Sequence, residues 1–321
     1  MRQPKGLILP AVILVGLGWI LTLRSHRRPS QTGDPQATVK VSGAWALYPL
    51  VVRWAEEFQQ QHPEVRVDVS AGGAGKGVTD ALTGLVDIGM VSRQIAAEEV
   101  KRGGIGVPVA QDVVLAVVNA QNPVRSKLLS QGLKRQTLLE LWITGQITTW
   151  GQVVGSPDRQ QVHVYTRSDA CGAAETWAQY LGQKQERLRG VAVYSDPGLA
   201  EAIRRDALGI GYCSLNYAFD MKTGRPLSGL QVVPLDVDGD GILEPGEKVH
   251  GSRQAVLAAV KAGRYPTPPA RYLHFLTRGQ PRGAVREFIL WTLREGQQYA
   301  ADVGYIPLPA AKVREALQKL R

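Results

Sequence analysis

Short β-branched segments and amphipathic segments alternate along most of this chain. Residues 38–43, 65–70 and 86–92 have the two-residue period of strands, whereas 45–63 and 75–85 carry apolar residues at the spacing of helices. The repeated order of strand and helix predicts an α/β fold, in which helices cover a parallel or mixed sheet.

Helical spacing also predicts which residues of the first amphipathic segment are buried. Leu47, Val51, Trp54, Ala55 and Phe58 lie on one face of 45–63, so we expect them in the core. Further predicted strands are 105–110, 113–119, 162–165, 209–219 and 271–279, and further predicted helical segments are 96–103, 136–155, 167–182 and 284–304.

The N-terminus contains one long apolar run, residues 6–23, with basic residues on both sides. A run of this length can span a bilayer as a helix. Because no A-x-A cleavage site follows it, we predict an uncleaved signal anchor, with a cleaved secretory signal as the alternative. The polar, turn-rich residues 29–37 read as a linker, so 1–36 form an anchor and linker that hold the body outside the cytoplasm.

Composition and charge narrow the possible partners. Of the 321 residues 44% are hydrophobic and 21% are charged, which is typical of a folded body, and the net charge is +10. No stripe of basic and aromatic residues appears, so we expect no nucleic-acid partner. The positive charge instead favours a small anion.

Candidate chemistry lies at four points where a predicted strand is followed by a turn or a helix start. Free amides at helix N-termini attract anions, and an arginine adds a bidentate donor. Each turn alone could serve packing, and Arg167 with Asp169 could be a plain local ion pair. Together they predict an oxyanion site at the carboxyl ends of the strands. The candidate ligand residues are Gly43, Ala44, Trp45, Gly73, Ala74, Gly75, Lys76, Ser92, Arg93, Arg167, Asp169, Cys171, Gly172 and Ala173.

An acidic stretch, residues 236–247, resembles the calcium loop of EF-hand proteins. It fits D-x-D-x-D-G-x5-E, in which oxygen atoms of the ligands surround one large cation. An acidic surface turn is the alternative, since no paired helices flank it. We predict a structural Ca²⁺ held by Asp236, Asp238, Asp240, the Ile242 carbonyl and Glu247, with Glu244 able to contribute directly or through water.

The two cysteines, Cys171 and Cys213, leave two alternatives open: one disulfide bridge, or two separate buried thiols. Cys171 begins a predicted helix near Arg167, a position that lowers a thiol pKa. The five histidines show no metal-binding or catalytic spacing, and we read His163 as structural. We therefore predict a binding protein rather than an enzyme.

Residues 48–67, 85–93, 141–153 and 265–309 resemble the phosphate-binding solute receptors that feed ABC importers. The resemblance implies a two-lobe type II periplasmic-binding-protein fold with hinge strands, preceded here by one transmembrane helix. It implies a first lobe of 37–118 plus 270–321 and a second lobe of 119–269. The implied function is capture of a small oxyanion, phosphate first, by a monomer that delivers it to an ABC permease; a membrane-anchored sensor or adhesion module of the same fold is the alternative.

The resemblance also implies a variant ligand site. The arginine, aspartate and capping glycine of the family match Arg167, Asp169 and Gly172. Hydroxyl residues of the family fall on Cys171 and Ala173 and near Trp45 and Ala74, and its proton-accepting carboxylate falls near Ser92. We expect backbone amides to remain as donors, with weaker binding unless Lys76 and Arg93 compensate, and weaker rejection of sulfate.

Overall fold

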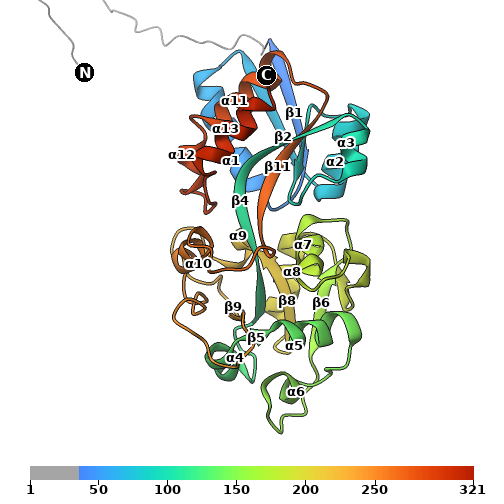
Figure 1. Ribbon diagram of the computed structural model, residues 1–321, viewed down its shortest axis with the longest axis vertical. Coiled ribbons are helices and arrows are strands. Elements are labelled where there is room, and N and C mark those ends of the chain that lie inside the picture. The colour runs from blue at the N-terminus through green and yellow to red at the C-terminus, as the bar shows by residue number, and fades with distance from the viewer. Residues whose placement is uncertain (1–35) are drawn as a thin grey trace, which may run out of the picture. The chain divides into compact units, whose positions relative to one another are not determined.

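A single sheet runs through the part of the chain that the structure describes, residues 36–321 of a computed structural model (Figure 1). Its strands lie in the order β2-β1-β3-β11-β4-β8-β6-β7, and β9 pairs with β4, while β10 and β5 form a separate pair. The strands are β1 (Ala37–Gly43), β2 (Val65–Ala71), β3 (Ile88–Val91), β4 (Gly104–Asn119), β5 (Leu133–Lys134), β6 (His163–Arg167), β7 (Val191–Val193), β8 (Gly209–Ser214), β9 (Leu230–Val232), β10 (Leu235–Asp236) and β11 (Ala270–Arg278).

Helices cover both ends of this sheet. The α-helices are α1 (Tyr48–Gln61), α2 (Ala74–Thr83), α3 (Ala97–Lys101), α4 (Arg125–Gln131), α5 (Arg135–Leu139), α6 (Trp150–Val154), α7 (Gly172–Tyr180), α8 (Asp196–Arg205), α9 (Leu215–Ala218), α10 (Arg253–Lys261), α11 (Gly283–Leu293), α12 (Gln297–Ala300) and α13 (Ala310–Gln318). A π-helical segment, Glu140–Thr144, follows α5, and a 3₁₀ turn, Gln185–Arg187, follows α7.

The predicted membrane anchor at 6–23 lies outside the described residues. Within residues 36–321, no helix is both long and apolar enough to cross a membrane.

The described residues form two hydrophobic cores. One core is built from residues between 39 and 110 together with residues between 273 and 320, and we call this part the first lobe. The other is built from residues between 113 and 270, and we call it the second lobe. The predicted α/β class and its two-lobe form are thus confirmed, and Leu47, Val51, Trp54, Ala55 and Phe58 are all buried as expected.

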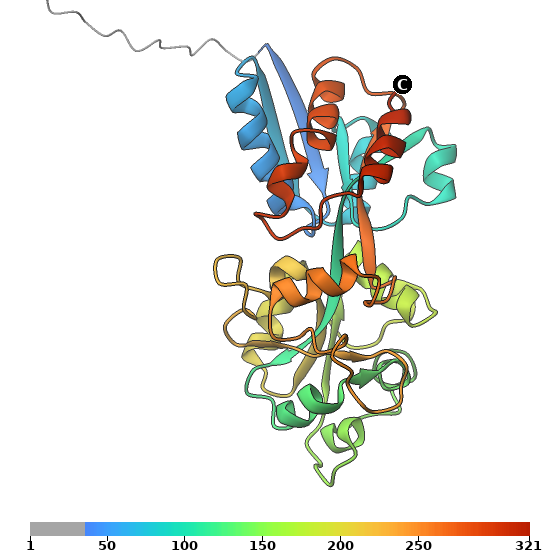
Figure 2. The same cartoon turned by 60° about the vertical axis from the view of Figure 1, so that its left-hand side comes forward.

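Two antiparallel strands, β4 and β11, carry the chain between the lobes (Figure 2). Gln111 and Asp112 of β4 lie opposite Tyr272 and Arg271 of β11, between the last residues of the two cores. The sequence had predicted two strands, 105–110 and 113–119. That prediction is wrong, because the polar pair Gln111–Asp112 continues the ladder instead of turning.

Two other predicted elements differ from the structure. The predicted helix 284–304 is broken between α11 and α12, where Gly296 packs against Thr292 and its carbonyl accepts a hydrogen bond of 2.7 Å from Trp54 Nε1. The predicted strand 209–219 ends at Ser214, and the short helix α9 follows. In the first case a contact with a distant residue, Trp54, accompanies the break in a continuous apolar pattern.

One buried histidine in the first lobe makes stability depend on pH. Burial, with Lys319 nearby, lowers the pKa of His274 from its ordinary 6.5 to about 4. The folded state therefore keeps the ring neutral while the unfolded chain takes up a proton below pH 6.5. We expect the free energy of unfolding to be highest above pH 6.5 and to fall between pH 6.5 and 4, with a slope approaching about 1.4 kcal/mol per pH unit.

Urea unfolding of the wild type and of His274→Gln between pH 7 and 5 checks this expectation. The variant should have a smaller slope in this range, which lies above the pH at which most carboxylates titrate. The slope that remains is expected from His250, whose pKa burial also lowers. An identical slope in both proteins would contradict it.

Candidate functional site

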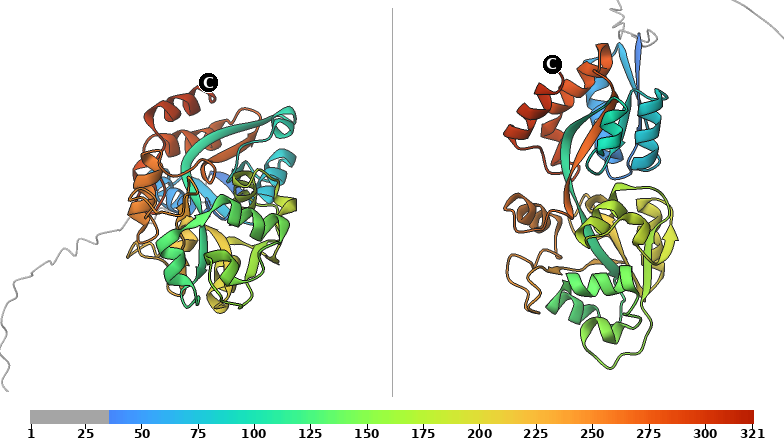
Figure 3. Two further views of the ribbon diagram at one scale, coloured as in Figure 1. Left: turned by 60° about the horizontal axis from the view of Figure 1, so that its bottom comes forward. Right: turned by 45° about the vertical axis from the view of Figure 1, so that its right-hand side comes forward.

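The predicted turns meet between the two lobes. In the first lobe they follow β1, β2 and β3, and in the second lobe the fourth follows β6. Gly75 N–H donates to the Ala170 carbonyl at 3.0 Å, which joins the lobes directly. Figure 3 shows the first-lobe helices α2 and α3 facing α7 across the same region.

Glycines make the approach of the lobes possible. A Cβ on Gly172 would overlap the backbone carbonyl and hydroxyl of Ser92, and a Cβ on Gly73 would lie 2.7 Å from an Asp169 carboxylate oxygen. Gly73 also has a φ of +91°, which disfavours other residues. The structure thus brings Gly73, Gly75, Ser92, Asp169 and Gly172 together.

Several backbone amides that the sequence analysis predicted as ligand donors already donate hydrogen bonds within the protein. Ala44 N–H donates to the Met90 carbonyl at 2.9 Å, and Gly73 N–H donates to the Gly43 carbonyl at 3.0 Å. Cys171 N–H donates to Gln185 Oε1 at 3.1 Å. These groups hold the turns in shape, so they are less available to an anion than the sequence suggested.

Other amides in the same turns remain available. Among residues 36–321, the N–H groups of Trp45, Ala74, Gly172 and Ala173 donate no hydrogen bond. The last three belong to the first turns of α2 and α7, where intrahelical acceptors do not exist. The interlobe region therefore offers several unpaired donors that fit an oxyanion.

Arg167 is the buried cation of this region, and two carboxylates hold it. Its Nε and Nη2 donate to the two oxygens of Asp169 at 2.8 and 2.6 Å, and its Nη1 donates to Asp196. Burial opposes the charge, but Asp196 and Asp169 outweigh it and raise the pKa of Arg167 above its ordinary range. The local pair of Arg167 and Asp169 is thus present, and an incoming anion meets a guanidinium that is already neutralised.

Asp196 is a site residue that the sequence analysis missed. It begins α8, where the preceding Ser195 caps the helix by accepting from Gly198 N–H at 3.1 Å. Ser195 has a φ of +69°, unusual for a residue with a side chain. The segment Ser-Asp-Pro is a helix-start signature, so the pattern could have located this turn, although not its contact with Arg167.

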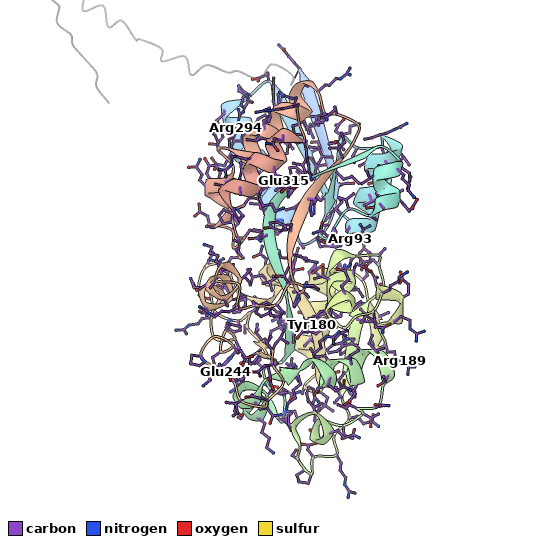
Figure 4. All side chains as sticks on the ribbon, viewed as in Figure 1. Arg93, Tyr180, Arg189, Glu244, Arg294 and Glu315 are labelled. Carbon is purple, nitrogen blue, oxygen red and sulfur yellow. The ribbon has the colours of Figure 1, made fainter. Side chains whose placement is uncertain are left out.

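The two other candidate cations are paired as well. Lys76 contacts the Asp80 carboxylate, which also accepts from Ser42 Oγ at 2.6 Å. Arg93 makes a bidentate pair with Glu99, at 3.0 and 2.6 Å. The hydrogen bonds that Arg93 donates to Glu99 are the largest influence on the Arg93 pKa and raise it. Figure 4 shows Arg93 at the edge of the first lobe that faces the second.

The cysteines are separate buried thiols, so the disulfide alternative is wrong. Cys171 caps α7, and its Sγ accepts from Ala174 N–H at 3.4 Å. Burial raises the pKa of Cys171 to about 12. The expected lowering of this pKa is therefore corrected: removal from water outweighs the field of the helix and of Arg167.

Trp45 joins the lobes through both its backbone and its ring. Its carbonyl accepts from Tyr217 Oη at 3.0 Å, and its ring lies edge-to-face with Tyr194 at a centroid distance of 6.2 Å. Among the described residues, its buried indole Nε1–H has no acceptor. Tyr194 and Tyr217 were not predicted, because only the fold brings them near Trp45.

A cavity of about 390 Å³ lies beside these turns. Residues of the first lobe, among them Gly75 and Arg93, form one wall, and residues of the second lobe, among them Cys171 and Glu175, form the other. The candidate site therefore borders an accessible space between the lobes.

The acidic loop lies in the second lobe, and Figure 4 shows its Glu244 there. Carboxylate oxygens of Asp236, Asp238 and Asp240 lie within 4.8 Å of one another, as do those of Asp238, Glu244 and Glu247. Asp236 is fully buried and accepts from the N–H groups of Gly239 and Gly241. The hard oxygen donors fit Ca²⁺, while Lys134, 4.0 Å from Asp236, is a partial counter-charge.

Comparison with known proteins identifies the family. The profile described as the PBP superfamily domain matches residues 29–295. The chain belongs to the PBP superfamily.

Relatives with curated names include the phosphate-binding protein PstS of Bacillus subtilis, 28% identical, which aligns with 88% of this chain and 86% of its own length. Protein SphX of Synechococcus elongatus is 29% identical, with 94% and 87% covered. A phosphate-bound solved structure from Clostridium perfringens has the same fold, with a TM-score of 0.68, 23% identity, and 85% of this chain and 100% of that chain covered. The resemblance stated from the sequence is thus confirmed.

Replacing Gly172 tests the contact between the lobes. Because a Cβ there would overlap Ser92, we expect Gly172→Ala to destabilise the observed arrangement by about 1–3 kcal/mol, the range for overpacked positions. Gly251→Ala is the matched control, since a Cβ there meets nothing within 4 Å. Small-angle scattering should show a larger radius of gyration for Gly172→Ala only, and equal radii for both variants would contradict the contact.

Proposed function

We propose that this protein is an extracytoplasmic receptor that captures phosphate between its lobes and delivers it to an ABC importer. The observation that carries the proposal is the set of unpaired helix-start amides of Ala74, Gly172 and Ala173 where the two lobes touch. The packing of Gly73 against Asp169, which pairs with the buried Arg167, supports it. Donors from both lobes can surround a tetrahedral oxyanion only when the lobes close, which also excludes water. The curated relatives named phosphate-binding protein support phosphate as the ligand.

Binding rather than catalysis fits the ionisable groups. The thiol of Cys171 stays protonated, since its pKa is raised to about 12, and it therefore lacks the thiolate needed for attack. His163 is held by Asp206 at 2.7 Å. Both groups serve structure in this account. Residues 6–23 would act as the membrane anchor, which keeps the receptor close to its permease.

A sensor or adhesion module with a different ligand is the second candidate. The pairing of Arg167, Lys76 and Arg93 with carboxylates favours it, because each pairing weakens attraction for a simple anion. The two candidates share the fold and differ in whether phosphate binds.

Calorimetric titration with phosphate, sulfate and molybdate separates these candidates. The protein is first freed of bound ligand by unfolding and refolding. We expect saturable phosphate binding, weakened roughly 10- to 100-fold in Arg167→Lys, which keeps the charge but loses the planar fork and with it a charge-assisted hydrogen bond of about 1.5–3 kcal/mol. Arg205→Lys, with its side chain 80% exposed in α8, is the control and should bind as the wild type does. No heat with any of the three anions would contradict the receptor proposal and favour the sensor.

We also propose that Asp236, Asp238, Asp240, Glu247 and the Ile242 carbonyl hold a structural Ca²⁺. The clustered carboxylates support this proposal, because they repel one another without a cation. The pKa of Glu244 is raised, first by its hydrogen bond with Glu247 and further by nearby carboxylates. Bound Ca²⁺ would fix the irregular loop 236–247 against the second lobe.

Thermal unfolding with and without calcium tests this site. At a concentration of about 100 Kd the ion should stabilise the fold by about 2.7 kcal/mol, which is a rise in Tm of roughly 5 °C or more. Asp240→Ala should abolish the rise, and Asp302→Ala, an exposed acidic residue outside the loop, should keep it. A melting curve that calcium leaves unchanged would contradict the proposed Ca²⁺ site.

A further inference from the structure

The ion pair of Arg167 and Asp196 continues into a chain of buried polar contacts. While Asp196 Oδ2 accepts from Arg167, its Oδ1 accepts from Ser214 Oγ at 2.8 Å. Ser214 lies at the end of β8, and its Oγ in turn accepts from Arg271 Nη2 at 2.9 Å. One hydroxyl group thus connects the candidate anion arginine with a second arginine.

Arg271 belongs to the hinge. Its Nη2 also donates to Asp112 Oδ2 at 2.9 Å, and the two residues are register partners on β11 and β4. These strands link the two cores, and residues 112 and 271 lie where one core ends and the other begins. The Arg271–Asp112 pair therefore stands where the backbone bends if the lobes open.

Every residue in this series of polar contacts is buried. Asp112 and Ser214 are 1% exposed, Asp196 is 4% and Arg271 is 7% exposed. In such surroundings polar contacts are strong, and a charge that loses its partner is costly. If one residue at either end moves, its partner cannot form a replacement hydrogen bond with water. The neighbouring polar residue therefore has to shift with it.

We propose that Asp196 and Ser214 are positioning residues that couple the hinge pair Arg271–Asp112 to Arg167. When β11 and β4 bend, Arg271 shifts relative to β8, and Ser214 and Asp196 transmit the shift to the guanidinium that faces the anion. Coupling is reciprocal, so an anion on Arg167 biases the hinge toward the closed arrangement. This inference rests on the proposed phosphate binding.

A double-mutant cycle tests the coupling. The phosphate Kd is measured for the full-length wild type, Asp112→Asn, Asp196→Asn and the double variant, with folding checked by circular dichroism. We expect the Kd of the double variant to differ about tenfold from the value obtained by multiplying the effects of the two single variants. This deviation is expected although the two carboxylates share no direct contact. The cycle is repeated in Ser214→Ala, where the fold-changes should multiply to within about twofold.

Two further backgrounds separate coupling from general destabilisation. Ser214→Thr keeps the hydroxyl and should restore the non-multiplicative effect. Thr292→Ala removes another buried hydroxyl, one that donates to the Ile289 carbonyl at 2.8 Å in α11, and should leave the coupling as in the wild type. Fold-changes that multiply in the wild type, or a coupling that survives Ser214→Ala, would overturn the proposal.

Failure of the proposed function is recognised separately. If the wild type binds no phosphate, the receptor proposal fails, and the same cycles are evaluated on urea unfolding midpoints without ligand. Coupling between Asp112 and Asp196 that depends on the Ser214 hydroxyl would then still support the link. Its absence would overturn it.

Discussion

The antiparallel pairing of β4 with β11 is the constraint on which the rest of the structure depends. Because these strands cross between the cores, they fix which turns of the first lobe face which turns of the second. The turns after β2 and β3 of the first lobe contact the turn after β6 of the second lobe at this junction. Helix-start amides that would be scattered in either lobe alone therefore share one region, and in the proposed receptor a rotation about these two strands would open or close it.

Charge in this region is balanced within the protein. Arg167, Lys76 and Arg93 each contact at least one carboxylate, so no bare cation faces the cleft from these positions. In the proposed site, attraction for an anion would therefore depend strongly on fixed N–H dipoles of the turns, in addition to the paired Arg167, and these dipoles keep their direction when a ligand arrives. This also explains how turns that lack hydroxyl groups, at Trp45, Ala74 and Ala173, can still present donors: the backbone supplies them.

Sequence analysis correctly predicted the features that depend on local sequence patterns. The face of α1 with Trp54 and Phe58, the strands before each glycine turn, and the turns themselves follow from periodicity and helix-start signals. It missed what distant contacts control: the ion pair of Asp196 with Arg167, and the break at Gly296, which binds the Trp54 indole. The thiol pKa of Cys171 was predicted in the wrong direction because the helix dipole is visible in the sequence, whereas complete burial is not.

The hinge raises the question of why an ion pair rather than apolar side chains occupies it. A buried pair adds little net stability, because desolvation offsets most of the attraction. Its geometric demand is strict, however, since Arg271 must reach Asp112, Ser214 and Thr176 at once, and these lie on β4, at the end of β8 and in α7. A slip of one residue between β4 and β11 would turn Arg271 to the opposite face and break all three contacts. The pair therefore fixes the register of the crossover strands, and with it the alignment of the two halves of the site.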